Sequence, residues 1–286
     1  MIKLKTLVAT LFVTATVITA SAQSLPIPPP SPWQTVKQQF ATSSISIDYS
    51  RPSVNGRTIF GDLVPYGKVW RTGANAATTI EFGDDVTINR VLVPKGKYGL
   101  LTIPSEKDWT IIISKDVNVT SDFDYNEKND VVRIMVKAAV LDRPQEMFTI
   151  GVENVKPTQA DIQLSWSKTL VSFTVTAEID AKIMAAIDKE MLSKNPPYHQ
   201  AANYYYENNK DLAKALEWST KAVAGNANAY WMSALKAKIE FKLKKYKDAV
   251  ASAEKSIEQA KKGHNEAYVK KNEELIKEIK AQPDFK

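Results

Sequence analysis

The sequence predicts a mainly β plus α protein, in which an antiparallel β-sandwich domain precedes an α-helical repeat domain. Three observations lead to this prediction. Short runs of β-branched and aromatic residues, broken by turn residues, fill residues 33–179. Helical hydrophobic spacing replaces them from about residue 180. A period of 34 residues then recurs within the helical part.

Composition excludes several classes of function. The chain of 286 residues is 44% hydrophobic and 24% charged, which suits globular domains rather than a disordered chain or a polytopic membrane protein. It contains no cysteine and only two histidines, His199 and His264. Disulfide frameworks, thiolate nucleophiles and cysteine-ligated metals are therefore excluded, and imidazole chemistry is nearly excluded.

Residues 1–22 predict a secretory signal peptide. Two lysines precede an apolar run from Leu7 to about Ile18, and small residues then place the cleavage after Ala22. The run is shorter than the ~20 residues that a membrane-spanning helix needs, so cleavage is favoured over an N-terminal anchor. We expect a periplasmic or secreted protein, without stable membrane insertion after cleavage.

A proline-rich spacer, residues 23–32, follows the predicted signal peptide. It contains five prolines, which favour extended polyproline II structure and supply neither a helix nor a central strand. We expect the first folded domain to begin after it, near Trp33.

The block over residues 33–179 predicts about ten short strands. Ile162, Leu164 and Trp166 alternate with polar residues, as in a strand with one buried face. The Pro94–Lys97 segment predicts a hairpin turn between two strands. Many short strands with frequent turns are typical of an antiparallel sandwich. The clearest predicted strands are Ile45–Tyr49, Val86–Val93, Tyr98–Ile103, Trp109–Ser114, Val131–Val140, Phe148–Val155, Asp161–Trp166 and Leu170–Thr176.

Residues 180–286 predict helices. Asp180 is the expected N-cap of the first helix, and apolar residues from Ile183 to Met191 follow at helical spacing until two prolines stop the run. The segment LAKALEWSTKAV, which begins at Leu212, is matched 34 residues later by YKDAVASAEKSI, which begins at Tyr246. This period is the mark of tetratricopeptide repeats, and both segments resemble the second helix of such a repeat.

The helical domain is therefore expected to be a tetratricopeptide-like array. The concave face of stacked helix pairs commonly docks peptides or proteins, so we expect a protein or peptide partner. The candidate partner-binding residues are aromatic: Tyr205, Trp218 and Trp231. The alternative is that these side chains form the core of the repeats.

The positive charge is confined to the helical domain. Residues 23–180 carry 16 basic and 18 acidic residues, whereas residues 181–286 carry 20 lysines, no arginine and 14 acidic residues. Nucleic-acid sites typically interleave arginine with aromatic residues, but lysine and glutamate on alternating helix faces are usually just solvated. We therefore expect no nucleic-acid partner.

The connection from about Ser50 to Thr78 contains the candidate ligand site. It is long for a compact domain, and such loops are often functional. Three arginines, Arg51, Arg57 and Arg71, are placed to form a fork for a carboxylate, a phosphate or a sugar hydroxyl. Nearby aromatic residues would supply a stacking surface. The alternative is that the arginines pair with Asp48, Asp62 or Glu81 and only hold the connection against the sheet.

The same region carries a family resemblance. The segments YSRPSVNGRTIFGDLVPYGKVWRTGANAATTIEF and VLVPKGKYGLLTIPSEKDWTIIISKD resemble the core motifs of bacterial domain-of-unknown-function family 2911 (DUF2911), over about residues 31–178. The resemblance implies a signal peptide and often a helical-repeat tail, but no assigned activity and no catalytic residue. It points to the following candidate ligand-binding residues: Tyr49, Arg51, Arg57, Tyr66, Trp70, Arg71, Asn75, Lys97 and Tyr98.

Catalysis is not favoured. The strand domain has no histidine for a Ser-His-Asp arrangement or a zinc site, although a pair of carboxylates, as in glycosidases, stays open. Residues 122–127 alternate oxygen ligands but lack the glycine and the spaced glutamate of a calcium loop, so we expect a solvated acidic loop. We expect no metal and no cofactor.

These observations favour a secreted or periplasmic, non-enzymatic binding or scaffold protein. Its helical repeats would dock a protein partner, and its sandwich would present the Arg/Tyr/Trp loop to a small anionic or sugar ligand. The alternative function is a carbohydrate-binding protein or carbohydrate-active enzyme of the cell envelope. A third alternative is a purely structural strand domain.

Overall fold

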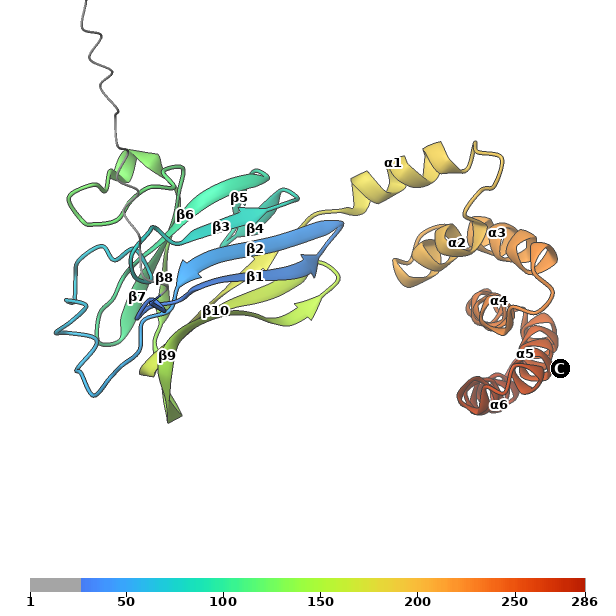
Figure 1. Ribbon diagram of the computed structural model, residues 1–286. Helices are drawn as coiled ribbons and strands as arrows, with labels where there is room; N and C mark the ends of the chain where they lie inside the picture. The colour runs from blue at the N-terminus through green and yellow to red at the C-terminus, as the bar shows by residue number, and fades with distance from the viewer. Residues whose placement is uncertain (1–26, 286) are drawn as a thin grey trace, which may run out of the picture. The chain divides into compact units, whose positions relative to one another are not determined.

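The computed structural model describes residues 27–285, and the chain divides into two compact units, one ending at Ala177 and one beginning at Glu178 (Figure 1). Within these residues, two antiparallel sheets precede six helices, which confirms the predicted mainly β plus α fold. The predicted signal peptide, its cleavage site and the start of the proline-rich spacer lie outside the described residues.

A six-stranded antiparallel sheet forms one layer of the first unit. Its strands alternate in burial, as in β2, where Ile45, Ile47 and Tyr49 are buried between more exposed neighbours. The sheet has the strand order β1-β2-β3-β6-β7-β8. The strands are β1 (Trp33–Phe40), β2 (Ser43–Ser50), β3 (Thr79–Phe82), β6 (Gly96–Ile103), β7 (Asp108–Ser114) and β8 (Asp130–Lys137).

A four-stranded sheet forms the second layer, with the order β5-β4-β10-β9. Its strands are β4 (Val86–Ile88), β5 (Val91–Val93), β9 (Ala139–Lys156) and β10 (Gln159–Thr176). The single strand predicted over Val86–Val93 is wrong: it is the β4–β5 hairpin, because Asn89 and Arg90 have φ values of 48° and 69° and reverse the chain.

Two further strand predictions differ from the structure. The segments Asp161–Trp166 and Leu170–Thr176 belong to one long strand, β10, whose pairing with β9 shifts register between Ser165 and Thr169. The Pro94–Lys97 segment is not a hairpin turn, because β5 and β6 lie in different sheets and this segment crosses between them.

Aromatic side chains from both sheets meet in the core. The Tyr49 ring of β2 lies edge-on to Phe148 of β9, with 5.7 Å between centroids, and Phe148 lies 5.8 Å from Trp166 of β10. Trp109 of β7 is also buried. Such edge-to-face contacts add to the apolar burial, and they show that the two sheets pack face to face as a sandwich.

A smaller apolar cluster covers the other face of the six-stranded sheet. Leu101 of β6, Ile112 of β7 and Val119 are almost fully buried there, and Val69 and Tyr125 pack against them. The central strands β6 and β7 are therefore buried on both faces, which explains their nearly continuous apolar sequences. The connections over residues 51–78 and 115–129 supply this cover.

The second unit is helical. Helices α3 and α5 begin at Leu212 and Tyr246, which are 34 residues apart, as the predicted period requires. Each helix from α2 onward packs on the next, and α4 also contacts α2 and α6, as in stacked helix pairs. The helices are α1 (Asp180–Glu190), α2 (Tyr198–Glu207), α3 (Leu212–Gly225), α4 (Tyr230–Lys242), α5 (Tyr246–Lys262) and α6 (Glu266–Lys280).

The N-cap of the first helix differs from the predicted one. The N-cap of α1 is Ile179 rather than Asp180, whose carboxylate instead accepts hydrogen bonds from the Tyr204 hydroxyl at 2.7 Å and the Lys210 Nζ at 2.8 Å.

In residues 27–285 we find no helix with both the length and the apolar character needed to cross a membrane.

Candidate functional site

The connection between β2 and β3, residues 51–78, is fixed by backbone pairing to β6. The Trp70 amide donates to the Thr102 carbonyl at 2.7 Å, and the Thr102 amide donates back at 3.0 Å. Buried threonines strengthen this attachment: the Thr78 hydroxyl donates to the Thr72 carbonyl at 2.7 Å, and the Thr72 and Thr102 hydroxyl oxygens lie 3.1 Å apart. The connection is therefore fixed to the central strand β6 around Trp70.

A tight turn follows Trp70 and accounts for the WRTGAN motif. Thr72 and Asn75 have φ values of 56° and 58°, in the left-handed region that asparagine tolerates but threonine rarely adopts. A Cβ on Gly73 would lie 2.9 Å from the Thr78 hydroxyl and 3.1 Å from the Ser50 carbonyl oxygen, so this position requires glycine. The Asn75 amide donates to the Ser31 carbonyl at 3.3 Å and ties the turn to the start of the unit.

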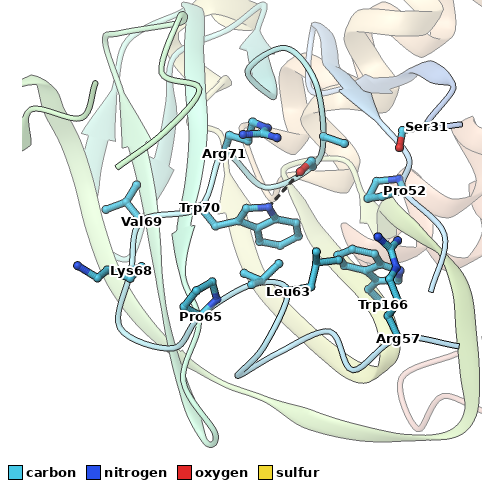
Figure 2. A pocket seen from close by; sticks show the side chains of 13 residues that line it. Ser31, Pro52, Arg57, Leu63, Pro65, Lys68, Val69, Trp70, Arg71 and Trp166 are labelled. Carbon is cyan, nitrogen blue, oxygen red and sulfur yellow. Dashed lines mark hydrogen bonds between the residues drawn. The ribbon is translucent and has the colours of Figure 1, made fainter. Parts of the chain in front are cut away.

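A cleft of about 290 Å³ opens beside this turn (Figure 2). Among the described residues that line it, none is Asp or Glu, whereas Arg57, Lys68 and Arg71 all lie on the 51–78 connection. The lining residues are Ser31, Pro52, Arg57, Leu63, Val64, Pro65, Lys68, Val69, Trp70, Arg71, Gly73, Ala74 and Trp166. The cleft therefore combines apolar walls with three cationic side chains.

The two arginines of the cleft donate hydrogen bonds to neutral oxygen atoms. Arg57 donates from Nε to the Val54 carbonyl at 3.0 Å and from Nη2 to the Ser53 carbonyl at 2.6 Å. Arg71 donates from Nη1 to the Thr120 carbonyl at 2.5 Å, and its buried Nε has no hydrogen-bond partner within residues 27–285. The two guanidinium groups are held in position, and within the described part of the chain neither forms an ion pair with a carboxylate.

Arg51 does not belong to the cleft. Its Nε donates to the Phe148 carbonyl at 3.0 Å and its Nη2 to the Thr149 hydroxyl at 2.7 Å, so it joins β2 to the second sheet. The predicted fork of three arginines is therefore wrong, because one member is used by the fold. The alternative pairing with Asp48, Asp62 or Glu81 is also wrong for these arginines, which donate to carbonyl and hydroxyl oxygens instead.

Lys97 and Asp48 form an ion pair of their own. The Lys97 Nζ lies 3.0 Å from Asp48 Oδ2, and the Thr35 hydroxyl donates to Oδ1 at 2.7 Å. Burial alone would raise the pKa of Asp48, but the hydrogen bonds from Thr35 and Lys97 outweigh it and hold this pKa below its usual value. Lys97 of β6 therefore reaches across β3 to β2 and does not line the cleft.

Two predicted aromatic ligand residues are part of the core. Tyr49 is fully buried, and its hydroxyl accepts a hydrogen bond from the Ile150 amide at 2.9 Å; burial raises the pKa of Tyr49. Tyr98 is 8% exposed and donates to the Pro94 carbonyl at 2.7 Å. Neither ring is open to a ligand, so both predictions are corrected. Tyr66 is exposed but does not line the cleft.

Trp70 offers the cleft only part of its ring. It stacks on Trp166 with 5.9 Å between centroids and 16° between planes, and Phe60, Trp109 and Phe148 lie edge-on around it. Its Nε1 donates to the Gly73 carbonyl at 3.0 Å. Neither Lys68 nor Trp166 is among the ligand-binding residues predicted from the sequence. Lys68 was detectable as a further cation in the same connection, whereas Trp166 lies on β10, far away in the sequence.

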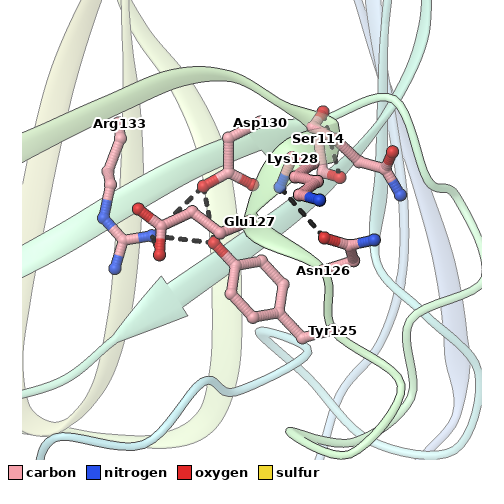
Figure 3. Close-up of polar contacts among 8 residues, drawn as sticks. Ser114, Tyr125, Asn126, Glu127, Lys128, Asp130 and Arg133 are labelled. Carbon is pink, nitrogen blue, oxygen red and sulfur yellow. Dashed lines mark hydrogen bonds and ion pairs between the residues drawn. The ribbon is translucent and has the colours of Figure 1, made fainter.

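A polar network anchors the neighbouring connection between β7 and β8, residues 115–129 (Figure 3). The Tyr125 hydroxyl donates to Asp130 Oδ2 at 2.5 Å, and Arg133 Nη1 donates to that hydroxyl at 2.7 Å and to Asp130 Oδ2 at 3.1 Å. Burial, and then the Asp130 carboxylate, raise the pKa of Tyr125 to about 12. The network fixes the end of this connection to β8.

The helical unit has a separate cleft of about 260 Å³. Trp231 lines it and is 39% exposed, but Tyr205 and Trp218 are only 4% and 5% exposed and pack ring on ring. The prediction that Tyr205 and Trp218 bind a partner is therefore corrected, because they form the helix core. The lining residues are His199, Asn203, Trp231, Ala234, Leu235, Lys238, Tyr268, Lys271, Asn272 and Leu275.

A family model described as a protein of unknown function (DUF2911) matches residues 31–175, about half of the chain. The chain belongs to the DUF2911 family. The resemblance predicted from the sequence motifs is thereby confirmed. The DUF2911 match contains every residue that lines the sandwich cleft, from Ser31 to Trp166, and ends before the helices begin. No curated protein and no solved structure matches the chain.

The titratable residues of the DUF2911 unit do not assemble a metal site. Within residues 27–285, no three His, Cys, Asp or Glu side chains are close enough together to hold a metal ion. In the acidic segment, Asp124 accepts hydrogen bonds from Thr120 at 2.8 Å and from Ser121 at 2.9 Å. Oδ2 of Asp124 is therefore engaged within the segment itself.

Proposed function

We propose that the DUF2911 unit binds a small anionic ligand, such as a carboxylate or a phosphate, in the cleft lined by Trp70. The observation that carries this proposal is that three cationic side chains line the cleft and no acidic side chain is among its described lining residues. A guanidinium presents several donors in one plane, which matches the oxygens of a carboxylate or phosphate.

The walls of the cleft support the same proposal. Leu63, Pro65, Val69 and Trp70 are apolar, and charge attraction is stronger beside apolar atoms than in bulk water. A volume of about 290 Å³ lies at the small end of ordinary ligand pockets. The cleft thus suits a compact anion with an apolar part rather than a long chain.

Binding is better supported than catalysis. Apart from Lys68, the described lining residues offer no carboxylate, imidazole or phenol that could act as a general base. The carbohydrate alternative has less support, because sugar rings usually stack on an open aromatic face. The aromatic residues that line the cleft are Trp166, which is 2% exposed, and Trp70, whose ring is stacked on Trp166. We therefore favour a non-enzymatic anion-binding protein.

A calorimetric titration tests this proposal. The panel contains acetate, citrate, inorganic phosphate, glucose 6-phosphate and glucose. We expect at least one anion to bind, glucose not to bind, and Lys68→Gln and Arg71→Gln each to weaken binding roughly tenfold, since each removes a charge-assisted hydrogen bond. Arg143→Gln, which removes the same charge from an exposed position on β9, is the matched control. Equal binding of glucose, or no effect of either variant, would contradict the proposal.

We further propose that the helical unit docks an acidic segment of a partner protein in the cleft beside Trp231. Lys238 and Lys271 line this cleft, and no Asp or Glu is among its described lining residues. A fluorescent oligoglutamate peptide should therefore bind, and Lys238→Gln should weaken it. Lys261→Gln on α5 is the control, because Lys261 is exposed outside the cleft. If the fluorescence anisotropy of the peptide does not change when the protein is added, the proposed docking of an acidic segment is contradicted.

The localisation is also a proposal, supported only by the sequence of residues 1–22. A charged start, a short apolar run and small residues before the cleavage position are typical of secretory signal peptides. Intact-mass analysis of the protein from its native envelope should show an N-terminus at Gln23. Retention of residues 1–22 would contradict the proposal of a periplasmic or secreted protein.

A further inference from the structure

Two of the three cations that line the sandwich cleft also hold the connection between β7 and β8. Arg71 donates to the Thr120 carbonyl at 2.5 Å, and the Lys68 Nζ lies 3.8 Å from Asp122 Oδ2. Both side chains line the cleft at the same time. The cleft and residues 120–122 of this connection therefore share two positive charges.

The rest of the connection is anchored independently of these cations. Val119 is 1% exposed and packs on Leu101 and Ile112, so the chain is fixed immediately before Thr120. On the other side, Tyr125 is held by the hydrogen bonds to Asp130 and Arg133 (Figure 3). Residues 120–124 thus form a short strap between two fixed points.

The strap itself has few attachments to the sheet. Phe123 at its centre is 94% exposed, and the Asp124 carboxylate accepts hydrogen bonds from Thr120 and Ser121, which both lie inside the strap. A segment with little buried apolar surface opens at low free-energy cost. Its contacts with Arg71 and Lys68 therefore determine how closely it is held.

We propose that residues 120–124 act as an internal competitor for the cleft: an anionic ligand that takes Arg71 and Lys68 releases the strap from them. This inference rests on the proposed function. Asp122 already offers Lys68 a carboxylate, and Thr120 offers Arg71 an oxygen, so the strap presents the cations with the kind of groups that the ligand would present. The coupling is reciprocal, so loosening the strap also strengthens ligand binding.

Arg71 should form stronger hydrogen bonds with an anionic ligand than with the strap. Its Nη1 donates to a neutral acceptor, the Thr120 carbonyl oxygen, and a hydrogen bond to a charged acceptor is stronger. A carboxylate or phosphate that accepts from Nη1 and Nη2 takes the place of the Thr120 carbonyl and adds a second hydrogen bond. The exchange therefore gains a charge-assisted pair of hydrogen bonds and loses one bond to a neutral oxygen.

A spin label on the strap tests this inference. The chain has no cysteine, so Phe123→Cys gives one labelling position on an exposed side chain. In the full-length protein we expect citrate or inorganic phosphate, whichever binds in calorimetry, to increase the mobility of the label. Val140→Cys, on a side chain of β9 that is 82% exposed, is the control and should show no change.

A second variant tests the competition directly. Asp122→Asn removes the competing carboxylate and leaves the cationic residues of the cleft in place, so we expect about two- to fivefold tighter binding of the same anion, the range of an exposed ion pair. Asp142→Asn is the control, because Asp142 is an exposed residue of β9. The Asp142→Asn variant should bind the same anion with the affinity of the wild type.

The outcomes separate the two proposals. If an anion binds but neither the label mobility nor the affinity of Asp122→Asn changes, the competition is overturned and the anion-binding function stands. If no anion in the panel binds to the wild type, the proposed function is overturned and this inference falls with it. Increased mobility together with tighter binding of Asp122→Asn supports both.

Discussion

Arg51 and Arg71 lie on the same connection but have different partners. Arg51 donates to Phe148 and Thr149 of β9 and so joins the two sheets, whereas Arg71 faces the cleft and the strap. The difference lies in the surroundings rather than in the side chain, because both are guanidinium groups on one loop. At the scale of the residue, position alone separates a structural arginine from a candidate ligand-binding one.

Arg51→Gln should destabilise the first unit without affecting the ligand. Its loss leaves the Phe148 carbonyl without this donor, which should lower the free energy of unfolding by about 2 kcal/mol. Chemical denaturation measures this loss, and calorimetry should show unchanged anion affinity. The control Arg143→Gln should stay within about 0.5 kcal/mol of the wild type. A loss of anion binding without a loss of stability would contradict our assignment.

Tyr125 should make the stability of the first unit depend on alkaline pH. Its folded pKa, about 12, is raised above the ordinary 10.0, so its contribution is complete below pH 10 and is lost as the pH rises toward 12. Between these values the wild type should lose unfolding free energy more steeply than Tyr125→Phe. Denaturant titrations at several pH values measure both slopes. Parallel slopes would show that the pKa of Tyr125 is not raised in the folded protein.

At the scale of elements, buried polar contacts bind the last three helices together. The Ser256 hydroxyl of α5 donates to the Tyr230 carbonyl of α4 at 2.7 Å. Asn272 of α6 is 3% exposed and donates to the Ser256 hydroxyl at 3.0 Å and to the Tyr268 carbonyl at 2.7 Å. Since these groups are removed from water, each depends on its partner. This relay fixes how α4, α5 and α6 pack.

Asn272→Ala should therefore destabilise the helical unit. It removes both donated hydrogen bonds and leaves a space beside Ser256, for a loss of about 1–3 kcal/mol in the free energy of unfolding. Thermal unfolding followed by circular dichroism at the helical wavelength measures it. Glu273→Ala, at an exposed neighbouring position on α6, should change stability by less than about 0.5 kcal/mol. Equal effects of the two variants would contradict the relay.

At the scale of the whole molecule, charge and architecture divide at the same place. The stretch of residues 23–180 has a net charge of −2, and residues 181–286 have a net charge of +6. The cationic cleft thus lies in the half of the chain with the lower net charge. Attraction of an anion there depends on Arg57, Lys68 and Arg71 at short range, which salt screens less than a long-range field.

The two units should unfold separately. The chain divides between Ala177 and Glu178, and each side has its own core. Calorimetry of the intact chain should show two transitions, and fragments 27–177 and 178–286 should each reproduce one of them. A single transition in the intact chain, shifted by both Arg51→Gln and Asn272→Ala, would show instead that the units unfold together.

The sequence by itself determined the class of each half, the family and the connection that carries the cleft. Alternation with period two in β10 and helical spacing in α1 are local properties, because neighbouring side chains alone define them. The WRTGAN motif likewise marks a turn, in which Thr72 and Asn75 both have positive φ values. Local patterns of this kind need no tertiary information.

Only the tertiary structure decided which residues line the site. Tyr49 is buried against Phe148, Arg51 bonds to a carbonyl 97 residues away in the sequence, and Trp166 reaches the cleft from a distant strand. The β4–β5 hairpin and the crossing at Pro94–Lys97 depend in the same way on which sheet each strand joins. Burial and hydrogen-bond partners are set by residues far apart along the chain, so no local pattern in the sequence specifies them.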